Sequence, residues 1–443
     1  MADPSRIQRS LNRALEAAED ASPVEALESV TRELGLALGA ASVSFLIVDL
    51  SGRALVRMAH IPLDGGPDAG SVPPPVGSRQ GKRHLAEESA TVLPFDGGPA
   101  EQAVRTQSVQ VLAPDDADAP DDEPPLWTVL APVTERGESI GLLEMRLPEE
   151  PDERSVAEIA RAAHLLAFVV IANRRHTDLF EWGQRTRPFT LSAEIQRRLL
   201  PASFTCEAGS FTLSAWLEPA ASIGGDTFDY SQARDALHLS LTDAMGHGVA
   251  SALTASLCLG SLRNSRRRGS SLLDQARTCN AELVEHAAES GSEGYVTGLL
   301  ARLDLVAGQL ALVNAGHVAP YLARGGTVTP IELPPDVPLG LFPDATFHVA
   351  TIALERGDRL VLVTDGMLER NAADFSIMDG VQETLALHPR EVVRALADKV
   401  LEMTGHALAD DATLLVLDWH GQHDQDRSSD AGSDTSRASA PMP

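Results

Sequence analysis

The sequence predicts a mixed α/β protein of the α+β class, built from two or three domains. Its 443 residues are too many for one hydrophobic core, which seldom grows beyond about 250–300 residues. Short apolar runs typical of strands dominate residues 210–418, and turn residues such as Ala307-Gly308 favour antiparallel neighbours. Segments with helical apolar spacing interrupt these runs at about 248–264, 270–289 and 390–404.

The first part of the chain predicts a smaller α/β domain. An apolar stripe at helical spacing near the N-terminus and a Ser-Pro-Val-Glu capping box at 22–25 indicate two helices. Residues 41–59 contain two apolar runs around a Ser51-Gly52 turn, which is the pattern of a β-hairpin. Residues 61–125 are rich in Pro, Gly and Asp, and we expect a mobile surface loop there.

Two further strand-like runs at 126–147 are joined by a turn at 135–138. Helices, a hairpin, an irregular middle, a second hairpin and a long helix follow one another in this order. Over about residues 20–172 this order resembles a GAF domain, a small α/β sensor fold. The resemblance implies a regulatory domain, and no residue identifies the ligand or signal that it senses.

Helical spacing runs from about residue 152 to 187 and resumes after Pro188, which interrupts it. The resumed helix has one apolar stripe, formed by Leu191, Ile195 and Leu199. We expect residues 173–200 to be a helical connector between two domains, through which the chain forms a homodimer. The alternative is that these stripes pack on their own domains.

The last residues predict a disordered tail, because the chain after His420 lacks the apolar residues to fold. The expected division of the chain is therefore a sensor domain at 1–172, the connector at 173–200, a second domain at 201–420 and the tail at 421–443.

The composition excludes several classes of partner. The formal net charge of −27 argues against nucleic acid or an anionic membrane surface. No segment approaches the ~20 apolar residues of a membrane span, and we expect a soluble, cytoplasmic protein. The three cysteines have neither metal-ligand spacing nor a disulfide pattern, which agrees with a reducing compartment. They are Cys206, Cys258 and Cys279.

Four aspartates share one setting, since each lies beside a tight turn where a strand-like run begins or ends. They are Asp226, Asp243, Asp365 and Asp410. If the strand ends converge, four carboxylates raise one another's pKa values unless a cation neutralises them. Oxygen ligands of this kind favour Mg²⁺ or Mn²⁺, commonly as a pair. Gly224, Gly225 and Gly366 would let the backbone bend beside these carboxylates.

The motifs GGDxxD, DxxGHG, NAGH, TDG and DDxT occur in this order over about residues 190–418. Together with the segment EIQRRLLP, they resemble the metal-dependent PPM-type serine/threonine phosphatases, and more narrowly the bacterial branch related to RsbU and SpoIIE. The resemblance implies an αββα sandwich with two divalent cations, Mn²⁺ or Mg²⁺, between its sheets.

The resemblance also implies the ligands and the chemistry. It assigns Asp243 as the bridging ligand with the main-chain carbonyl of Ala244 beside it, Asp365 and Asp410 as further ligands, and Asp226 as a ligand directly or through water. No side-chain nucleophile is implied. A hydroxide bridging the two metals would attack phosphoserine or phosphothreonine in line.

Other residues have open roles. Asp229, Asp411, Gly225 and Gly366 are candidates to orient ligands or waters, and Asp411 could equally cap a turn. His247 could donate a proton or bind phosphate, or could fix its turn by hydrogen bonding. Asn314 and His317 lie in the NAGH motif, with a turn role as the alternative.

The function that this resemblance implies is a cytoplasmic phosphoprotein phosphatase regulated by the GAF-like domain. Its substrate would be a phosphorylated STAS-type anti-sigma antagonist. A catalytically degenerate, ligand-sensing scaffold in the same pathway is the alternative, and ligand loss would distinguish it. A two-metal nuclease or phosphodiesterase is a second alternative, but it should have His-rich motifs and a basic groove, which the charge of −27 argues against.

Overall fold

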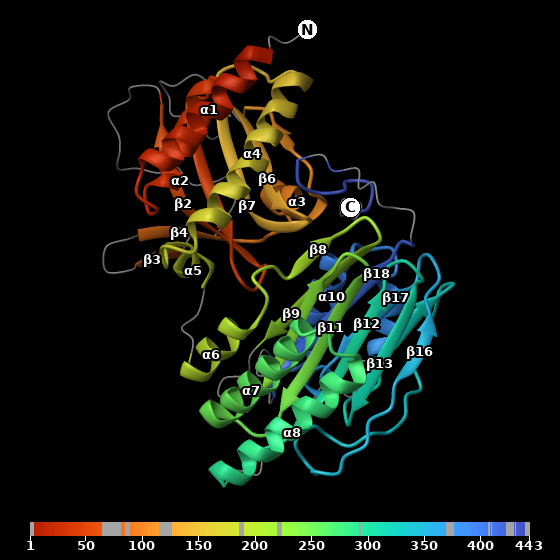
Figure 1. The fold of residues 1–443 in the computed structure, drawn as a ribbon. Coiled ribbons are helices and arrows are strands. Elements are labelled where there is room, and N and C mark those ends of the chain that lie inside the picture. The colour runs from red at the N-terminus through yellow and green to blue at the C-terminus, as the bar shows by residue number, and fades with distance from the viewer. Residues whose placement is uncertain are drawn as a thin grey trace. The chain divides into compact units, whose positions relative to one another are not determined.

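The computed structural model divides the chain into two compact units (Figure 1). Residues 1–188 and 428–443 form the N-terminal unit, and residues 189–427 form the second unit. The structure describes residues 4–63, 81–84, 89–114, 126–185, 190–218, 224–291, 294–368, 376–405, 408, 410–421, 429 and 431–438.

The N-terminal unit is built on one seven-stranded antiparallel sheet in the order β3-β4-β2-β1-β7-β6-β5. Its strands are β1 (Ser42–Val48), β2 (Ala54–Pro62), β3 (Gly81–His84), β4 (Ser89–Pro94), β5 (Gln110–Leu112), β6 (Trp127–Glu135) and β7 (Glu138–Leu147). The hairpins expected at 41–59 and 126–147 are the pairs β1–β2 and β6–β7.

Helices cover both faces of this sheet. The helices α1 (Pro4–Asp20), α2 (Ala26–Leu38) and α4 (Glu153–Asn173) lie over one face (Figure 1). The short helix α3 (Pro99–Thr106) packs on the other face, where Val104 contacts a cluster that includes Leu46 and Leu142. Because side chains alternate along a strand, Phe45 joins the first core and Leu46 the second.

The expectation of a surface loop at 61–125 is wrong for the described part of that range. It contains β3, β4, α3 and β5, and Ala90, Leu93 and Ala103 are buried in the two cores. The acidic segment at 115–125 lies outside the described residues. The resemblance of this unit to a GAF domain stays a prediction.

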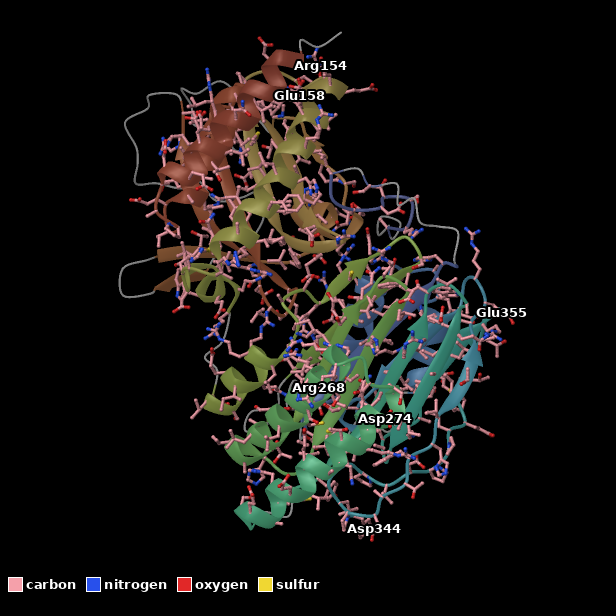
Figure 2. All side chains as sticks on the ribbon, in the orientation of Figure 1. Arg154, Glu158, Arg268, Asp274, Asp344 and Glu355 are labelled. Atoms are coloured by element: carbon pink, nitrogen blue, oxygen red, sulfur yellow. The ribbon has the colours of Figure 1, made fainter. Side chains whose placement is uncertain are left out.

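The long helix expected from 152 to 187 ends earlier, at Asn173, and a separate short helix α5 (Leu179–Gln184) follows. The apolar side of α4 packs on its own sheet through residues such as Leu166 and Val170, while Arg154 and Glu158 form an ion pair of 3.2 Å on its exposed side (Figure 2). In α5, Phe180 is buried in the same core. This part of the expected connector therefore belongs to the N-terminal unit, and dimerisation stays a prediction.

Among the described helices, α4 alone is long and apolar enough to cross a membrane by length and composition. The expectation that no segment approaches a membrane span is wrong for α4 by these two criteria. Of its most apolar stretch, 33% is buried inside the protein. Core helices of soluble proteins meet the same criteria of length and composition.

The second unit contains two antiparallel sheets. One has five strands in the order β10-β11-β12-β13-β16, and the other has six in the order β15-β14-β17-β18-β9-β8. The strands of the first are β10 (Asp226–Gln232), β11 (Ala236–Ala244), β12 (Val296–Asp304), β13 (Gln309–Ala315) and β16 (Ala350–Ala353). Those of the second are β8 (Thr205–Glu207), β9 (Phe211–Glu218), β14 (Tyr321–Arg324), β15 (Thr327–Pro330), β17 (Arg359–Val363) and β18 (Ala412–Trp419).

The two sheets pack face to face over a core that includes Phe211, Phe228, Leu241 and Leu415. The helices α7 (Gly248–Arg267) and α8 (Leu272–Ser290) cover the outer face of the five-stranded sheet (Figure 1). The helices α9 (Ile377–Glu383) and α10 (Pro389–Met403) pack against the six-stranded sheet. The expected αββα sandwich is confirmed.

The helix α6 (Leu191–Leu199) packs on α7, within the second unit. Its expected apolar stripe is wrong, because Leu191 is 66% exposed and the buried side is formed by Ser192, Ala193 and Gln196. A polar residue can occupy this buried side because Gln196 is hydrogen-bonded there.

The expectation of a disordered tail is also wrong for residues 431–438, which form turns, with Ser433 and Asp434 buried. They belong to the N-terminal unit. This segment lacks apolar residues. Hydrogen bonds within the segment and the close packing of Gly432 stabilise it instead.

Candidate metal centre

The ends of four strands bring the predicted aspartates to one edge of the sandwich. Asp226 is the first residue of β10 and pairs directly with Asp243 near the end of β11. Asp365 follows β17, and Asp410 precedes β18. Because β17 and β18 are antiparallel neighbours, the end of one and the start of the other lie at the same edge, and β18 contacts β10.

Burial and neighbouring charges raise the pKa values of two of these carboxylates. Burial and the charges of Asp243 and Asp411 raise the pKa of Asp226 well above its usual value. Burial, followed by the charges of Asp365, Asp410 and Asp411, raises the pKa of Asp243 to about 7. Both causes favour the protonated form of a carboxyl group.

Two threonines that the sequence analysis missed hold Asp226 in place. Its Oδ2 accepts hydrogen bonds from Thr364 Oγ1 at 2.7 Å and Thr413 Oγ1 at 2.5 Å. Thr364 directly precedes Asp365, and Thr413 comes two residues after Asp411. The signal that could have found them is this position inside the TDG and DDxT motifs.

Asp411 lies beside these carboxylates and organises the bend before β10. Its Oδ2 accepts from the backbone N–H of Gly225 at 3.2 Å and that of Asp226 at 3.4 Å. Gln196 of α6, a second residue that sequence analysis missed, donates from Nε2 to the same oxygen at 2.7 Å and to the Asp226 carbonyl at 2.8 Å. Asp411 therefore caps a turn that carries Asp226, and α6 is hydrogen-bonded directly to that turn.

Two glycines permit close backbone approaches around the carboxylates. A Cβ at Gly225 would overlap the carbonyl oxygen of Ala244 and would lie 2.9 Å from Ser251 Oγ. A Cβ at Gly366 would overlap the carbonyl oxygen of Asp411. Both positions therefore require glycine for packing, and Ala244 is held next to the Asp226–Asp243 pair.

The placement of Asp229 does not agree with an orienting role for a metal ligand. Asp226 and Asp229 are three residues apart on β10, so their side chains point to opposite faces of the sheet. Asp229 is buried against α7, where its carboxylate forms ion pairs of 2.8 Å with Arg263 and with Arg266. Asp229 thus fastens α7 to the sheet.

The two candidate histidines differ in their surroundings. His247 is an exposed residue at the start of α7, and its side chain makes no capping hydrogen bond to that helix. His317 is half-buried, with Nδ1 2.8 Å from Thr297 Oγ1 and Nε2 donating to the Val363 carbonyl at 3.2 Å. Because Thr297 lies in β12 and Val363 in β17, His317 links the two sheets next to Asp365. Asn314 has the turn role, since its side chain bonds both backbone groups of His317.

Replacing His317 with Ala should lower the free energy of unfolding by about 1–3 kcal/mol, because the Thr297 hydroxyl and the carbonyl of buried Val363 lose their partner. Burial lowers the pKa of His317 to about 4, below its usual 6.5. The contribution of His317 to stability is therefore lost as pH falls from about 6.5 to 4, and the variant should lack this pH dependence. Thermal unfolding at pH 7.5 and 5 measures both effects. His286→Ala, on α8, is the control, and equal losses in the two variants would contradict the assignment.

The donors at this edge are chemically suited to divalent cations. They are carboxylates, with one main-chain carbonyl held beside them. Among the described residues, no three acidic, histidine or cysteine side chains are gathered closely enough to hold a metal ion. The chemistry of these donors nevertheless fits a divalent cation.

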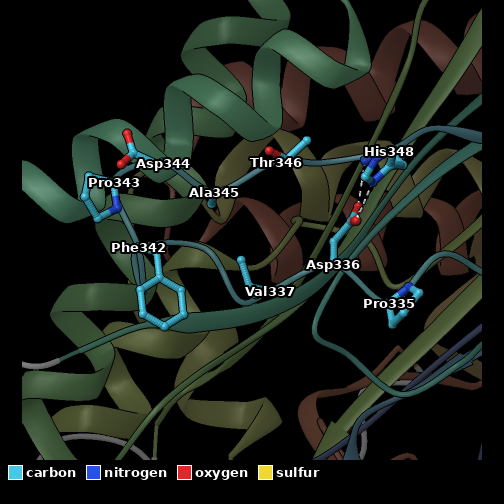
Figure 3. Close-up of a pocket in the computed structure, with 9 residues that line it drawn as sticks. All are labelled: Pro335, Asp336, Val337, Phe342, Pro343, Asp344, Ala345, Thr346 and His348. Atoms are coloured by element: carbon cyan, nitrogen blue, oxygen red, sulfur yellow. Dashed lines mark hydrogen bonds and ion pairs between the residues drawn. The ribbon is translucent and has the colours of Figure 1, made fainter.

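A cavity of about 520 Å³ lies elsewhere in the second unit (Figure 3). It is lined by Pro335, Asp336, Val337, Phe342, Pro343, Asp344, Ala345, Thr346 and His348. The Asp336 carboxylate accepts a hydrogen bond from the backbone N–H of His348 at 2.6 Å. Its other oxygen lies 2.7 Å from Nδ1 of the His348 ring. None of the clustered carboxylates lines this cavity.

A comparison with protein families shows what the second unit is similar to. Residues 233–420 match the family model described as Stage II sporulation protein E (SpoIIE). Because of this similarity, the second unit is called the SpoIIE-type domain below. The match includes Asp243, Asp365 and Asp410, and it begins after Asp226.

The SpoIIE-type domain has relatives in Bacillus subtilis (strain 168). The phosphoserine phosphatase RsbU is 24% identical over 234 residues, which are 51% of this chain and 68% of RsbU. The phosphoserine phosphatase RsbP is 23% identical over 242 residues, which are 52% of this chain and 58% of RsbP. A solved structure of the SpoIIE PP2C phosphatase domain with a fragment of its regulatory domain is 20% identical. It covers 49% of this chain and 66% of that one, with a TM-score of 0.41.

Proposed function

We propose that this protein is a Mn²⁺- or Mg²⁺-dependent phosphatase that hydrolyses phosphoserine or phosphothreonine on a regulatory protein. The observation that carries the proposal is the Asp226–Asp243 pair, whose pKa values are raised by burial and by neighbouring carboxylates at one edge of the SpoIIE-type domain. The similarity to RsbU and RsbP, which are phosphoserine phosphatases, supports it. All four expected aspartates are present there, which disfavours the degenerate scaffold.

Each residue of the site has a proposed role. Asp243, the Ala244 carbonyl, Asp365, Asp410 and Asp226 would hold two cations. Bound cations would lower the pKa of a water molecule so that it ionises at neutral pH. Their positive charge would also stabilise the negative charge on the phosphoryl oxygens. Thr364 and Thr413 would orient Asp226 and favour its ionised form by donating to its carboxylate. His247, exposed at the start of α7, is available to donate a proton to the leaving seryl oxygen.

The substrate that we propose is a phosphorylated STAS-type anti-sigma antagonist in a cytoplasmic pathway. It rests on the similarity to RsbU and RsbP, and the net charge of −27 supports a protein partner over nucleic acid. We also propose that the N-terminal unit, as a GAF-like sensor, regulates turnover.

The test is hydrolysis of a phosphoserine peptide by the full chain with Mn²⁺, Mg²⁺ or EDTA. We expect turnover with a divalent cation, none with EDTA, and loss of activity in Asp365→Asn. The matched control is Asp274→Asn, at the exposed start of α8 (Figure 2), which should keep full activity. Metal-independent turnover, or equal activity in both variants, would overturn the proposal.

Regulation is proposed to act through α6, because Gln196 connects this helix to Asp411 and to the backbone of Asp226. Gln196→Leu removes the 2.7 Å donor to Asp411, so we expect the cation concentration for half-maximal turnover to rise about 10-fold. The measurement is a Mn²⁺ titration of peptide hydrolysis. Arg198→Ala, on the exposed side of α6, is the control, and an unchanged titration in Gln196→Leu would exclude this route.

A further inference from the structure

The last described residues of the chain dock on the N-terminal unit. Residues 431–438, here called the C-terminal turn, cluster with residues 1–188 rather than with the SpoIIE-type domain that directly precedes them. The chain therefore leaves the N-terminal unit at Pro188, forms the whole second unit and returns to the N-terminal unit from Ser428 onward. This return is independent of the proposed phosphatase activity.

The contact is a close approach of two backbones. The N–H of Gly137, in the turn between β6 and β7, donates to the carbonyl of Gly432 at 3.1 Å. A Cβ at Gly432 would overlap the carbonyl oxygen of Thr134 and would lie 2.5 Å from His164 Nδ1 on α4. The φ of Gly432 is +99°, in a region that other residues rarely adopt. Both the space and the conformation therefore require glycine at this position.

The surface that receives Gly432 is itself fixed by a hydrogen bond. His164 Nδ1 donates to the Thr134 carbonyl at 2.7 Å, and the His164 ring packs edge-on against Phe168 at 4.9 Å between centroids. The β6–β7 turn and α4 are thereby held together where the C-terminal turn docks. We call Thr134, Gly137 and His164 the docking surface.

The C-terminal turn has a shape fixed by its own side chains. The Asp434 carboxylate accepts from the N–H of Ser436 at 3.2 Å and from its hydroxyl at 2.5 Å, and it pairs with Arg437 at 3.2 Å. Ser433 and Asp434 are only 2% and 3% exposed, whereas Thr435 is exposed. A peptide whose turn is preformed loses less conformational entropy on binding, so a small contact can suffice.

We propose that the docking surface is a peptide-binding site whose ligand is the C-terminal turn of the same chain. The site and its ligand belong to one chain, and intramolecular binding can raise the effective concentration of a ligand to the millimolar range. A modest intrinsic affinity therefore keeps the site filled. The filled site holds the last described residues of the chain on the N-terminal unit.

The test uses the chain without its tail, residues 1–427, and a fluorescein-labelled peptide of residues 428–443. Fluorescence anisotropy should show saturable binding below ~1 mM. Gly432→Ala in the peptide should weaken binding at least about 10-fold, because of the overlap and the unfavourable φ. Thr435→Ala, at an exposed position, is the matched control and should bind like the native peptide. No saturable binding, or equal binding of the Gly432→Ala peptide, would overturn the proposal.

A second set of variants tests the receiving surface. His164→Ala in the 1–427 chain should weaken peptide binding about 5-fold or more, since the Thr134 carbonyl loses its donor. His176→Ala, an exposed histidine of the same unit, should leave binding unchanged. Circular dichroism confirms that each variant is folded.

The full chain tests whether the ligand is intramolecular. It should bind the labelled peptide at least about 10-fold more weakly than the 1–427 chain, because its own tail occupies the site. Equal binding by the two chains would overturn the intramolecular arrangement. A dimer in light scattering that becomes a monomer on removal of the tail would overturn it as well, in favour of exchange between copies.

Discussion

Asp243→Asn should reduce metal-dependent turnover of a phosphoserine peptide by at least ~10³-fold, a loss of about 4 kcal/mol of transition-state stabilisation. Asp243 pairs directly with Asp226 across β10 and β11, and Asp365, Asp410 and Asp411 all raise its pKa. An amide in this position has one neutral oxygen in place of an anionic carboxylate and so binds divalent cations poorly. Initial rates over a range of Mn²⁺ concentrations measure the loss. Turnover within about 10-fold of the native chain at saturating Mn²⁺ would show that Asp243 is not a principal ligand.

The same variant should be more stable than the native chain when metal is removed. The pKa of Asp243 is raised from its usual 3.8 to about 7, so the folded chain holds this proton more tightly than the unfolded chain. The contribution of Asp243 to the stability of the metal-free chain is therefore fully present at low pH and is lost as pH rises from about 4 to 7. The asparagine variant lacks this titration and should gain on the order of 3 kcal/mol at pH 8. Urea unfolding in EDTA at pH 5 and 8 tests the sign. A gain at pH 5 only would contradict it.

Gly225→Ala should lower turnover at least ~100-fold and reduce the free energy of unfolding by about 2–4 kcal/mol. The added Cβ would overlap the Ala244 carbonyl oxygen and lie 3.3 Å from Asp243 Oδ1. Either β10 or β11 must then shift, because both contacts are to groups held by the strand pairing. Such a shift misplaces two proposed metal ligands at once. Initial rates and urea unfolding measure the two losses.

The matched control for this variant is Gly260→Ala, in the middle of α7. A Cβ at Gly260 would meet no atom within 4 Å. Alanine favours a helix over glycine by about 1 kcal/mol, so this variant should be as stable as the native chain or slightly more so. Unchanged activity in both glycine variants would show that the close approach at Gly225 is not needed for the site.

Much of the candidate site could be predicted from sequence because strands have a simple geometry. An aspartate at the end of an apolar run lies at an edge of a sheet wherever that strand pairs, so Asp226, Asp243, Asp365 and Asp410 could be placed before any pairing was known. The same alternation predicts that Asp226 and Asp229 face opposite sides, and applying it would have separated them. The layers of the sandwich were predicted through the resemblance to PPM-type phosphatases, which rests on the order of the motifs.

Three features depended on contacts between residues far apart in the sequence. The buried side of α6 carries Gln196 rather than its apolar stripe, because Asp411, 215 residues away, accepts its hydrogen bond. The apolar side of α4 packs on the sheet of its own unit. The helical spacing of its apolar residues is equally compatible with this packing and with a dimer interface. A polar tail found a docking surface because Gly432 fits between Thr134 and His164.

The sequence by itself determined the main strands and helices of the second unit and which carboxylates stand at their ends, because periodicity and turn chemistry are local. Only the tertiary structure decided what each polar group bonds. Partners for Gln196, Asp411 and Gly432 lie on distant segments, and the free energy of burying a polar group depends on whether such a partner is there.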